Sequence, residues 1–174
     1  MKYTVLIAGG FKPPHKGHYN YLNFYLEHPD VEKVILFCGD KKRNGVSQEA
    51  TEAMLRAFGT LDHPKMDYKR ATQRIGKKKS FTNPLADCYD WADENSEISC
   101  GLGWSSKDKG YQVGFMKYFS GDDLVISPPM FNMVDNVSAT AFREAILDGS
   151  SIKEFLPDHV NEENILKILE IEVS

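Results

Sequence analysis

The chain has 174 residues, which corresponds to about one domain at roughly 150 residues per domain. Hydrophobic residues make up 41% and charged residues 26%, with a mean hydropathy of −0.42, so the chain can form a folded core and does not belong to the disordered class. Its 21 basic and 25 acidic residues give a net charge of −4, which argues against binding of nucleic acid through bulk charge.

The first 40 residues have the pattern of a β–α–β unit. The apolar run Tyr3 to Ala8 is rich in β-branched residues and ends in two glycines, which is typical of a buried strand. Gly17 to Glu27 carries apolar residues at three- and four-residue steps and is stopped by His28-Pro29, as in an amphipathic helix. Val31 to Cys38 repeats the strand pattern. This order predicts two parallel strands joined by a right-handed crossover.

The middle of the chain is less regular. Ser47 is placed to cap a helix that runs to about Leu61. Residues 65–79 hold a third of all basic residues and show little apolar periodicity, so we expect them to be mostly loop, within a basic and mobile segment at about 62–82. Asn83-Pro84 signals the start of a helix through about Asp93, and Glu97 to Leu102 has the pattern of a strand.

The last third returns to alternating elements. Lys109 to Phe119 has helical spacing, and Asp123 to Ser127 has the pattern of a strand that two prolines stop. Ser138 is placed to cap a helix to about Leu147, and a C-terminal helix is expected at about 158–172.

Strands that alternate with helices along the whole chain predict a parallel sheet covered on both faces. No internal repeat, long low-complexity tract or linker divides the chain. We therefore expect a single domain over residues 1–174, with an α/β, Rossmann-like, doubly wound fold in which a parallel sheet lies between helical layers.

The three cysteines, Cys38, Cys88 and Cys100, form neither a disulfide framework nor a CxxC pair with zinc-ligand spacing. The N-terminal apolar run is far shorter than the roughly 20 residues that span a membrane, and it has no signal-peptide cleavage pattern. We expect a cytoplasmic protein that does not associate with membranes.

The loop after the first strand is the strongest candidate for an anion site. Its sequence GGFKPPHKGH lacks the GxGxxG spacing, and no GxxxxGK[ST] occurs in the chain. Gly9 and Gly10 let the backbone approach a ligand, and two prolines stiffen the loop. His15 and His18 flank Gly17 where a helix begins, so histidine N–H groups join a helix N-terminus that already attracts phosphate. A lone histidine here would more often be an ordinary surface residue, but the complete string favours the anion site.

This string resembles the HxGH signature of the nucleotidylyltransferase superfamily, in the form GxFxPxHxGH. The matching residues are Gly9, Phe11, Pro13, His15, Gly17 and His18. A second signature of that family, [IV]SxTxxR at the start of a late helix, is matched by VSATAFR at Val137 to Arg143. The specific resemblance covers residues 5–22 and 136–147 and leaves the middle of the chain unplaced.

The second motif also has a physical meaning of its own. Ser138 can cap the helix while the N–H groups of its first turn point toward an anion. Thr140 and Arg143 are three residues apart and share a helix face, so Arg143 can place a planar charge near a phosphate that Thr140 hydrogen-bonds. Without the first motif, a capped surface helix with a solvated arginine would be the better interpretation.

The resemblance implies an enzyme that joins AMP or CMP from a nucleoside triphosphate to a small phosphorylated acceptor and releases pyrophosphate. It implies that ATP or CTP binds at the two helix N-termini, with Mg²⁺ on its phosphates and no metal ligand from the protein. The acceptor phosphate attacks the α-phosphorus in line without a covalent intermediate, so catalysis rests on positioning and charge stabilisation. The expected catalytic residues are His15, His18, Lys12 and Arg143, and the expected nucleotide-binding residues are Gly9, Gly10, Phe11, Gly17, Ser138, Thr140 and Arg143.

The chain departs from the family pattern at Gly10, usually serine or arginine, and at Lys12, usually a polar or acidic residue. Lys12 either contacts a phosphate or is solvated. Among the basic residues 41–43, Lys42 is our candidate for substrate binding, although no clean local motif identifies it. The segment Trp104 to Asp108 either binds the substrate, by stacking Trp104 on a base or by holding a substrate phosphate, or is a buried tryptophan beside a polar turn.

A second hypothesis is a non-catalytic module of the same fold that senses a nucleotide or binds nucleic acid. The basic run is usually a solvated loop, with closure over an anionic substrate or contact with RNA as alternatives, and no aromatic interleaving favours RNA. The full set of phosphate donors favours the enzyme, so nucleic acid is not an expected partner. Small members of the family are often dimers or larger, which leaves a homo-oligomer open.

Overall fold

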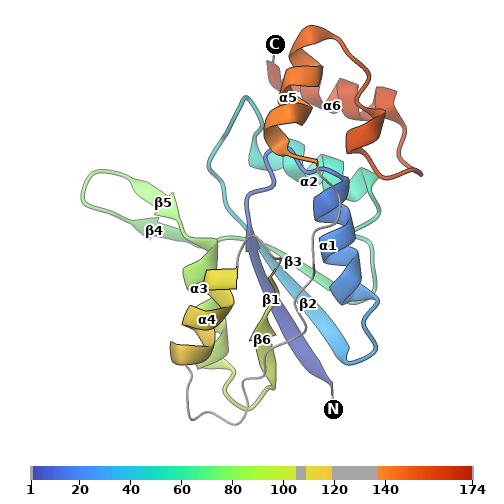
Figure 1. The fold of residues 1–174 in the computed structure, drawn as a ribbon. Coiled ribbons are helices and arrows are strands. Elements are labelled where there is room, and N and C mark those ends of the chain that lie inside the picture. Colours follow the sequence, from blue (N-terminus) through green and yellow to red (C-terminus); the bar gives the residue numbers. More distant parts are fainter. Residues whose placement is uncertain (1, 105–108, 119–136, 174) are drawn as a thin grey trace.

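Among the described residues, four parallel strands form the sheet at the centre of the molecule (Figure 1). The computed structural model describes residues 2–104, 109–118 and 137–173. In sheet order the strands are β3 (Met66–Arg70), β2 (Val31–Cys38), β1 (Tyr3–Gly9) and β6 (Cys100–Leu102). The chain moves outward from β1 to β2 and β3 and then returns to pair β6 with the other side of β1. This reversal at β1 confirms the doubly wound α/β fold and marks the place where such sheets bind ligands.

The sheet is buried on both faces because its side chains alternate between two cores. Val5, Ile7, Val34 and Leu36 belong to one apolar cluster. Leu6, Ile35 and Phe37, at the intervening positions, belong to the other. This period of two with apolar residues on both sides is what a parallel sheet between helical layers requires.

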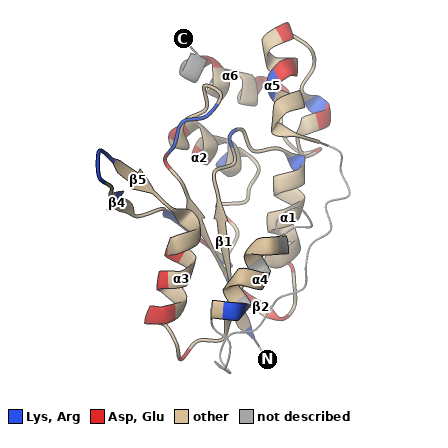
Figure 2. Cartoon of the chain, turned by 60° about the vertical axis from the view of Figure 1, so that its left-hand side comes forward, with Lys and Arg blue, Asp and Glu red and all other residues tan. Residues whose placement is uncertain are grey.

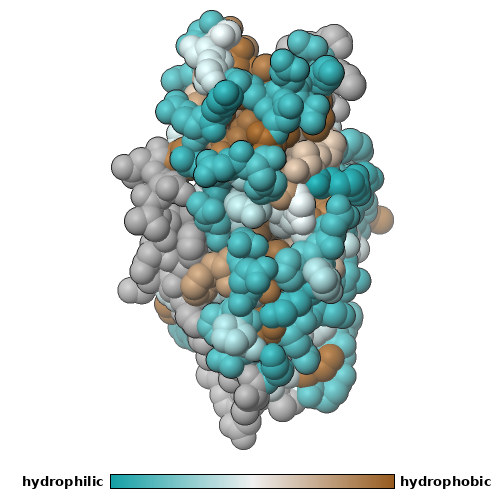
Figure 3. Space-filling model, turned by 90° about the vertical axis from the view of Figure 1, so that its right-hand side faces the viewer, coloured by the Kyte–Doolittle hydropathy of each residue, from teal (hydrophilic) through white to brown (hydrophobic). Residues whose placement is uncertain are grey.

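The two cores are covered by different helices. On the first lie α1 (Lys16–Leu26), α2 (Gln48–Ala57), α5 (Ala139–Asp148), the short 3₁₀ helix Lys153–Phe155 and α6 (Glu162–Val173). On the second lie α3 (Pro84–Glu94) and α4 (Lys109–Tyr118). The face turned to the viewer in Figure 3 is mostly hydrophilic, with apolar residues in scattered areas. Within the part of the chain that the structure describes, no helix has the length and apolar character needed to cross a membrane.

The predicted helix caps are present. Ser47 Oγ accepts a hydrogen bond from Ala50 N at 3.0 Å, and Asn83 Oδ1 accepts one from Ala86 N at 3.1 Å. Ser138 caps α5 in the same way. Gly149 ends α5 with a φ of 77°, in the left-handed region that glycine adopts readily.

The expectation that residues 65–79 are mostly loop is wrong. Met66–Arg70 forms β3, the edge strand that pairs in parallel with β2. The strand was not predicted because its charged residues interrupt the apolar pattern of a buried strand. Such residues are common on a strand at the exposed edge of a sheet. Beyond it, β4 (Gln73–Ile75) and β5 (Ser80–Thr82) form an antiparallel hairpin outside the main sheet. The strand predicted at Asp123 to Ser127 lies outside the described residues.

Candidate active site

The loop after β1 is held by a close contact between an aromatic ring and a glycine. A Cβ on Gly9 would lie 2.6 Å from Phe11 Cζ, so only glycine fits under this ring. Phe11 has a φ of 51°, and its ring meets the ring of His18 edge-on, with centroids 4.7 Å apart. Thr51 Oγ1 donates to Phe11 O at 2.9 Å and thereby ties the loop to α2. The conformation of the loop after β1 and the contact with the Phe11 ring therefore position the His18 ring.

The two histidines cap α1 reciprocally. His15 Nδ1 accepts hydrogen bonds from Gly17 N at 3.0 Å and His18 N at 3.4 Å, and His18 Nδ1 accepts one from His15 N at 3.2 Å. Since Nδ1 accepts in both rings, the network assigns the ring proton to Nε2 in each. The rings stack with centroids 3.8 Å apart. His15 and His18 have the three-residue spacing of a capping box. This spacing was visible in the sequence, but we interpreted the two histidines only as anion-binding residues of the family motif.

Lys12 is buried rather than solvated. It is 6% exposed, and its ammonium donates to Gly10 O at 2.9 Å and Gly39 O at 3.1 Å, which joins the carboxyl ends of β1 and β2. Burial lowers the pKa of Lys12, while the neighbouring Cys38 and Asp40 act in the opposite direction. An ammonium has three N–H donors, and two of them have acceptors among the described residues. Its position at the floor of the adjoining cavity makes a phosphate contact feasible.

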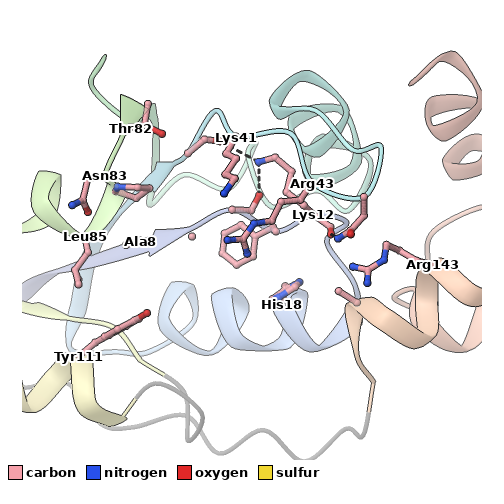
Figure 4. Close-up of a pocket in the computed structure, with 17 residues that line it drawn as sticks. Ala8, Lys12, His18, Lys41, Arg43, Thr82, Asn83, Leu85, Tyr111 and Arg143 are labelled. Atoms are coloured by element: carbon pink, nitrogen blue, oxygen red, sulfur yellow. Dashed lines mark hydrogen bonds between the residues drawn. The ribbon is translucent and has the colours of Figure 1, made fainter. Parts of the chain in front are cut away.

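A cavity of about 570 Å³ opens at the carboxyl ends of β1 and β2. Four cationic side chains line it, namely Lys12, Lys41, Arg43 and Arg143 (Figure 4). Among the described residues, no aspartate or glutamate lines it, and no group of histidine, cysteine and acidic residues could hold a metal ion. Cations around a concave space concentrate a positive potential, which suits a polyanion.

The two sequence motifs meet in this cavity. His18 reaches it from α1 and Arg143 from α5, although they are far apart in the chain (Figure 4). Ala139 also lines it, whereas Ser138 and Thr140 do not. Arg143 lies 3.5 Å from Thr140 Oγ1, so Thr140 contacts the arginine rather than the cavity. Gly9, Gly10 and Phe11 complete the wall formed by the loop after β1.

Other sequence candidates lie outside the cavity. Lys42 does not line it, whereas its neighbours Lys41 and Arg43 do. Trp104 is 8% exposed and does not line it; its backbone N–H donates to Tyr25 Oη at 3.0 Å. This position fits the buried interpretation of Trp104. His15 and Gly17 are buried in the first turn of α1, behind the lining residues.

The end of the cavity far from Arg143 was not identified from the sequence. Thr82, Asn83 and Leu85, from the end of β5 and the start of α3, line this end together with Tyr111 from α4 (Figure 4). Thr82 Oγ1 donates to Asp40 Oδ1 at 2.9 Å, and hydrogen bonds from Gln73 and Thr82 lower the pKa of Asp40. The cap signal at Asn83 was visible in the sequence, but nothing there indicated that this helix start faces the loop after β1.

No protein-family model matches the chain. Two curated relatives are archaeal proteins named nicotinamide-nucleotide adenylyltransferase. The relative from Thermococcus onnurineus (strain NA1) is 26% identical over 168 residues, which cover 90% of this chain and 79% of the relative. The relative from Pyrococcus furiosus is 27% identical over 171 residues, which cover 90% of this chain and 80% of the relative.

Solved structures share the fold over almost the whole chain. The nicotinic acid mononucleotide adenylyltransferase of Plasmodium falciparum, complexed with APC, has a TM-score of 0.61 at 11% identity, covering 99% of this chain and 100% of that one. A bifunctional NMN adenylyltransferase/ADP ribose pyrophosphatase from Francisella tularensis, complexed with AMP and a Mn ion, also has a TM-score of 0.61, at 17% identity. The match covers 99% of this chain but 52% of the bifunctional one, so this chain spans about half its length.

Proposed function

Because the chain belongs to the nucleotidylyltransferase superfamily, whose enzymes transfer a nucleotidyl group and release pyrophosphate, we propose that it transfers the adenylyl group of ATP to a nicotinamide-type mononucleotide. The observation that carries the proposal is the convergence of His18, Lys12 and Arg143 on one cavity without a described acidic lining residue. The names of the relatives favour adenylyl over cytidylyl transfer.

The triphosphate binds at the end of the cavity formed by His18, Lys12 and Arg143. His18 Nε2–H donates to a non-bridging oxygen of the α-phosphate, where charge changes during transfer. Arg143 offers a permanent planar charge to the outer phosphates, and Lys12 contributes its remaining N–H. The acceptor's phosphate oxygen attacks the α-phosphorus, the bond from that phosphorus to the bridging oxygen breaks, and pyrophosphate leaves. The protein forms no covalent bond, so its role is to position the two substrates and stabilise charge.

The other end of the cavity takes the acceptor. Leu85 and Tyr111 supply apolar and aromatic surface there, which suits the face of a planar ring. Lys41 and Arg43, from the loop after β2, lie beside Lys12 between the two ends of the cavity (Figure 4) and supply charge for the acceptor phosphate. This assignment places the reacting phosphates of both substrates among cations.

A divalent ion is implied by the family, and one structural neighbour was solved with AMP and a Mn ion. The described lining residues include no carboxylate. Mg²⁺ prefers phosphate oxygens and water with few protein ligands, so it enters with ATP as part of the substrate.

The test is a matrix of nucleotides and acceptors with pyrophosphate release as the readout. ATP, CTP, GTP and UTP are each paired with nicotinamide mononucleotide, nicotinic acid mononucleotide, phosphopantetheine and glycerol phosphate, with and without Mg²⁺. We expect Mg²⁺-dependent release only with ATP and one of the two pyridine mononucleotides, with the dinucleotide product identified by mass spectrometry. Faster turnover with CTP, or ATP binding without turnover on any acceptor, would contradict the proposal.

A further inference from the structure

The hairpin β4–β5 projects from the body of the molecule as a fixed arm (Figure 1). Its root is held on two sides. Arg74 donates to Asp87 and Asp90 of α3, each at 2.7 Å, and Thr82 donates to Asp40 after β2. Three consecutive lysines, Lys77 to Lys79, occupy the turn between the strands. The anchoring at the root presents this turn to the surroundings in a defined place.

The arm exposes apolar side chains that nothing in the described chain covers. Ile75 is 95% exposed and Phe81 is 42% exposed. Ile75 pairs with Ser80 and Arg74 pairs with Phe81, so Ile75 and Phe81 point to opposite faces of the ribbon. An isolated two-stranded ribbon is only marginally stable in water. Burial of Ile75 against a partner would therefore stabilise the arm as well as the contact.

The arm and the rest of the chain carry opposite charges. Residues 73–82 hold four basic and no acidic residues, which leaves 17 basic against 25 acidic residues, a net charge of −8, on the remainder. The stretch that follows the lysine turn in sequence carries only negative charges. Residues 80–106 contain five acidic residues and no basic one. Three of the five are exposed at the C-terminal end of α3 or just after it, namely Asp93, Glu94 and Glu97. Acidic residues also mark this end of α3, remote from the hairpin, in Figure 2.

We propose that two copies of this chain associate through these arms, with the lysine turn of each hairpin against the acidic end of α3 in the other copy. The two surfaces are complementary, and a two-fold axis makes the contact twice. Ile75 is buried at the contact. A nucleic acid is the less suitable occupant of the arm, because a body with a net charge of −8 repels the phosphate backbone.

Sedimentation velocity on the purified chain tests the association. We expect a dimer at tens of micromolar protein in low salt that dissociates in high salt, because exposed charges are screened. Lys77→Glu with Lys78→Glu should weaken dimerisation by about tenfold or more, since like charges then face each other. Glu94→Lys with Glu97→Lys should weaken it equally. Lysine at position 94, in the last turn of α3, complements the helix dipole, and position 97 is exposed beyond the helix, so we expect this variant to keep its fold.

The decisive experiment mixes the two double variants. Each double variant by itself brings like charges together and should dimerise only weakly. The acidic hairpin of one variant is complementary to the basic end of α3 in the other, so an equimolar mixture should form a heterodimer. Lys153→Glu with Lys167→Glu changes the net charge by the same amount as the hairpin variant and should leave the dimer unchanged. A monomeric wild type, a mixture that stays monomeric, or a monomer whose Lys77 and Lys78 instead bind RNA would overturn the proposal. None of these readouts depends on catalysis.

Discussion

His15 and His18 use their two ring nitrogens for different purposes. Both Nδ1 atoms accept backbone hydrogen bonds at the start of α1, which fixes the orientation of the rings. Each Nε2 then carries the proton and points away from the cap. His18 presents this donor to the cavity, while His15, which is 3% exposed, supports it by stacking. The same capping box therefore folds the helix and prepares a donor for the proposed reaction.

Replacements that mimic one nitrogen at a time separate these purposes. In His18→Asn the amide oxygen can replace Nδ1 as the cap acceptor, but the Nε2 donor is lost, so we expect a folded protein with turnover reduced about 100- to 1000-fold. His18→Gln can return a donor near Nε2 and should recover part of the loss. The measurement is kcat for pyrophosphate release, with circular dichroism to check the fold. Wild-type turnover in His18→Asn would show that Nε2 is not the donor.

Gly9 is required by packing rather than by its own backbone angle. A methyl group there would meet Phe11 Cζ at 2.6 Å, so Gly9→Ala must displace the ring and should lower the free energy of unfolding by about 1–3 kcal/mol. At Gly10 the nearest atom to a Cβ is Lys12 Cγ at 3.8 Å, so Gly10→Ala should change stability by less than about 0.5 kcal/mol. Urea unfolding of both variants makes the comparison. Equal stability losses would mean that the Phe11 ring moves aside freely.

At the scale of elements, one buried carboxylate joins the hairpin to α3. Asp87 has a side chain that is 4% exposed, and it accepts hydrogen bonds from Thr72 N and Arg74, each at 2.7 Å. Asp90 accepts from the same arginine, but its side chain is 56% exposed. The start of α3 lines the cavity, so this junction also sets the position of one wall of the site.

The two carboxylates that share Arg74 should differ in their contribution to stability. Asp87→Ala removes a carboxylate that is 4% exposed and leaves the partly buried Thr72 N–H and one arm of the Arg74 guanidinium, whose side chain is 30% exposed, without this acceptor, so we expect a loss of about 1–3 kcal/mol. Asp90→Ala removes only an exposed ion pair and should cost less than about 1 kcal/mol. Urea unfolding at neutral pH distinguishes them. A larger loss for Asp90→Ala would contradict the burial argument.

Sequence reasoning succeeded for elements whose signals are local. Ser47, Asn83 and Ser138 were identified as caps because a capping side chain acts within three residues of its own position. It failed for β3, whose pairing with β2 depends on backbone contacts distant in sequence and whose exposed edge tolerates charge. The far end of the cavity was missed for a related reason, because Tyr111 and Leu85 meet only once α3 and α4 have packed on the sheet.

At the scale of the whole molecule, the position of the site follows from topology. The strand order reverses at β1, where β2 lies on one side and β6 on the other, and the loop after β1 therefore lies at the point where doubly wound sheets bind ligands. The two motifs flank this point, as the resemblance predicted, and the solved structures share the fold that brings them together. The sequence could not show that Lys41 and Arg43 line the cavity and Lys42 does not, because the direction of each side chain depends on the conformation of the loop after β2.

The charge distribution of the folded chain also predicts its response to acid. Hydrogen bonds from Gln73 and Thr82 lower the pKa of Asp40, and a hydrogen bond from Ser150 lowers that of Asp148. Burial raises the pKa of Glu52, but hydrogen bonds from Arg70 and Tyr68 outweigh it, so that pKa is lowered too. In acid the unfolded chain therefore binds more protons than the folded one.

This stabilisation is fully present above the unfolded pKa values of about 4 and is lost as the pH falls through the lower folded values. We expect the free energy of unfolding from these three groups to be constant between about pH 7 and pH 5 and to fall between about pH 4 and pH 2. Urea unfolding across this range measures it. In Glu52→Gln the free energy of unfolding should fall less steeply between about pH 4 and pH 2 than in the control Glu154→Gln, whose residue is exposed. The reason is that protonation of Glu52 weakens its interaction with Arg70, and glutamine at this position has no such proton to bind. An acid limb of unchanged slope in Glu52→Gln would show that Arg70 does not stabilise the carboxylate.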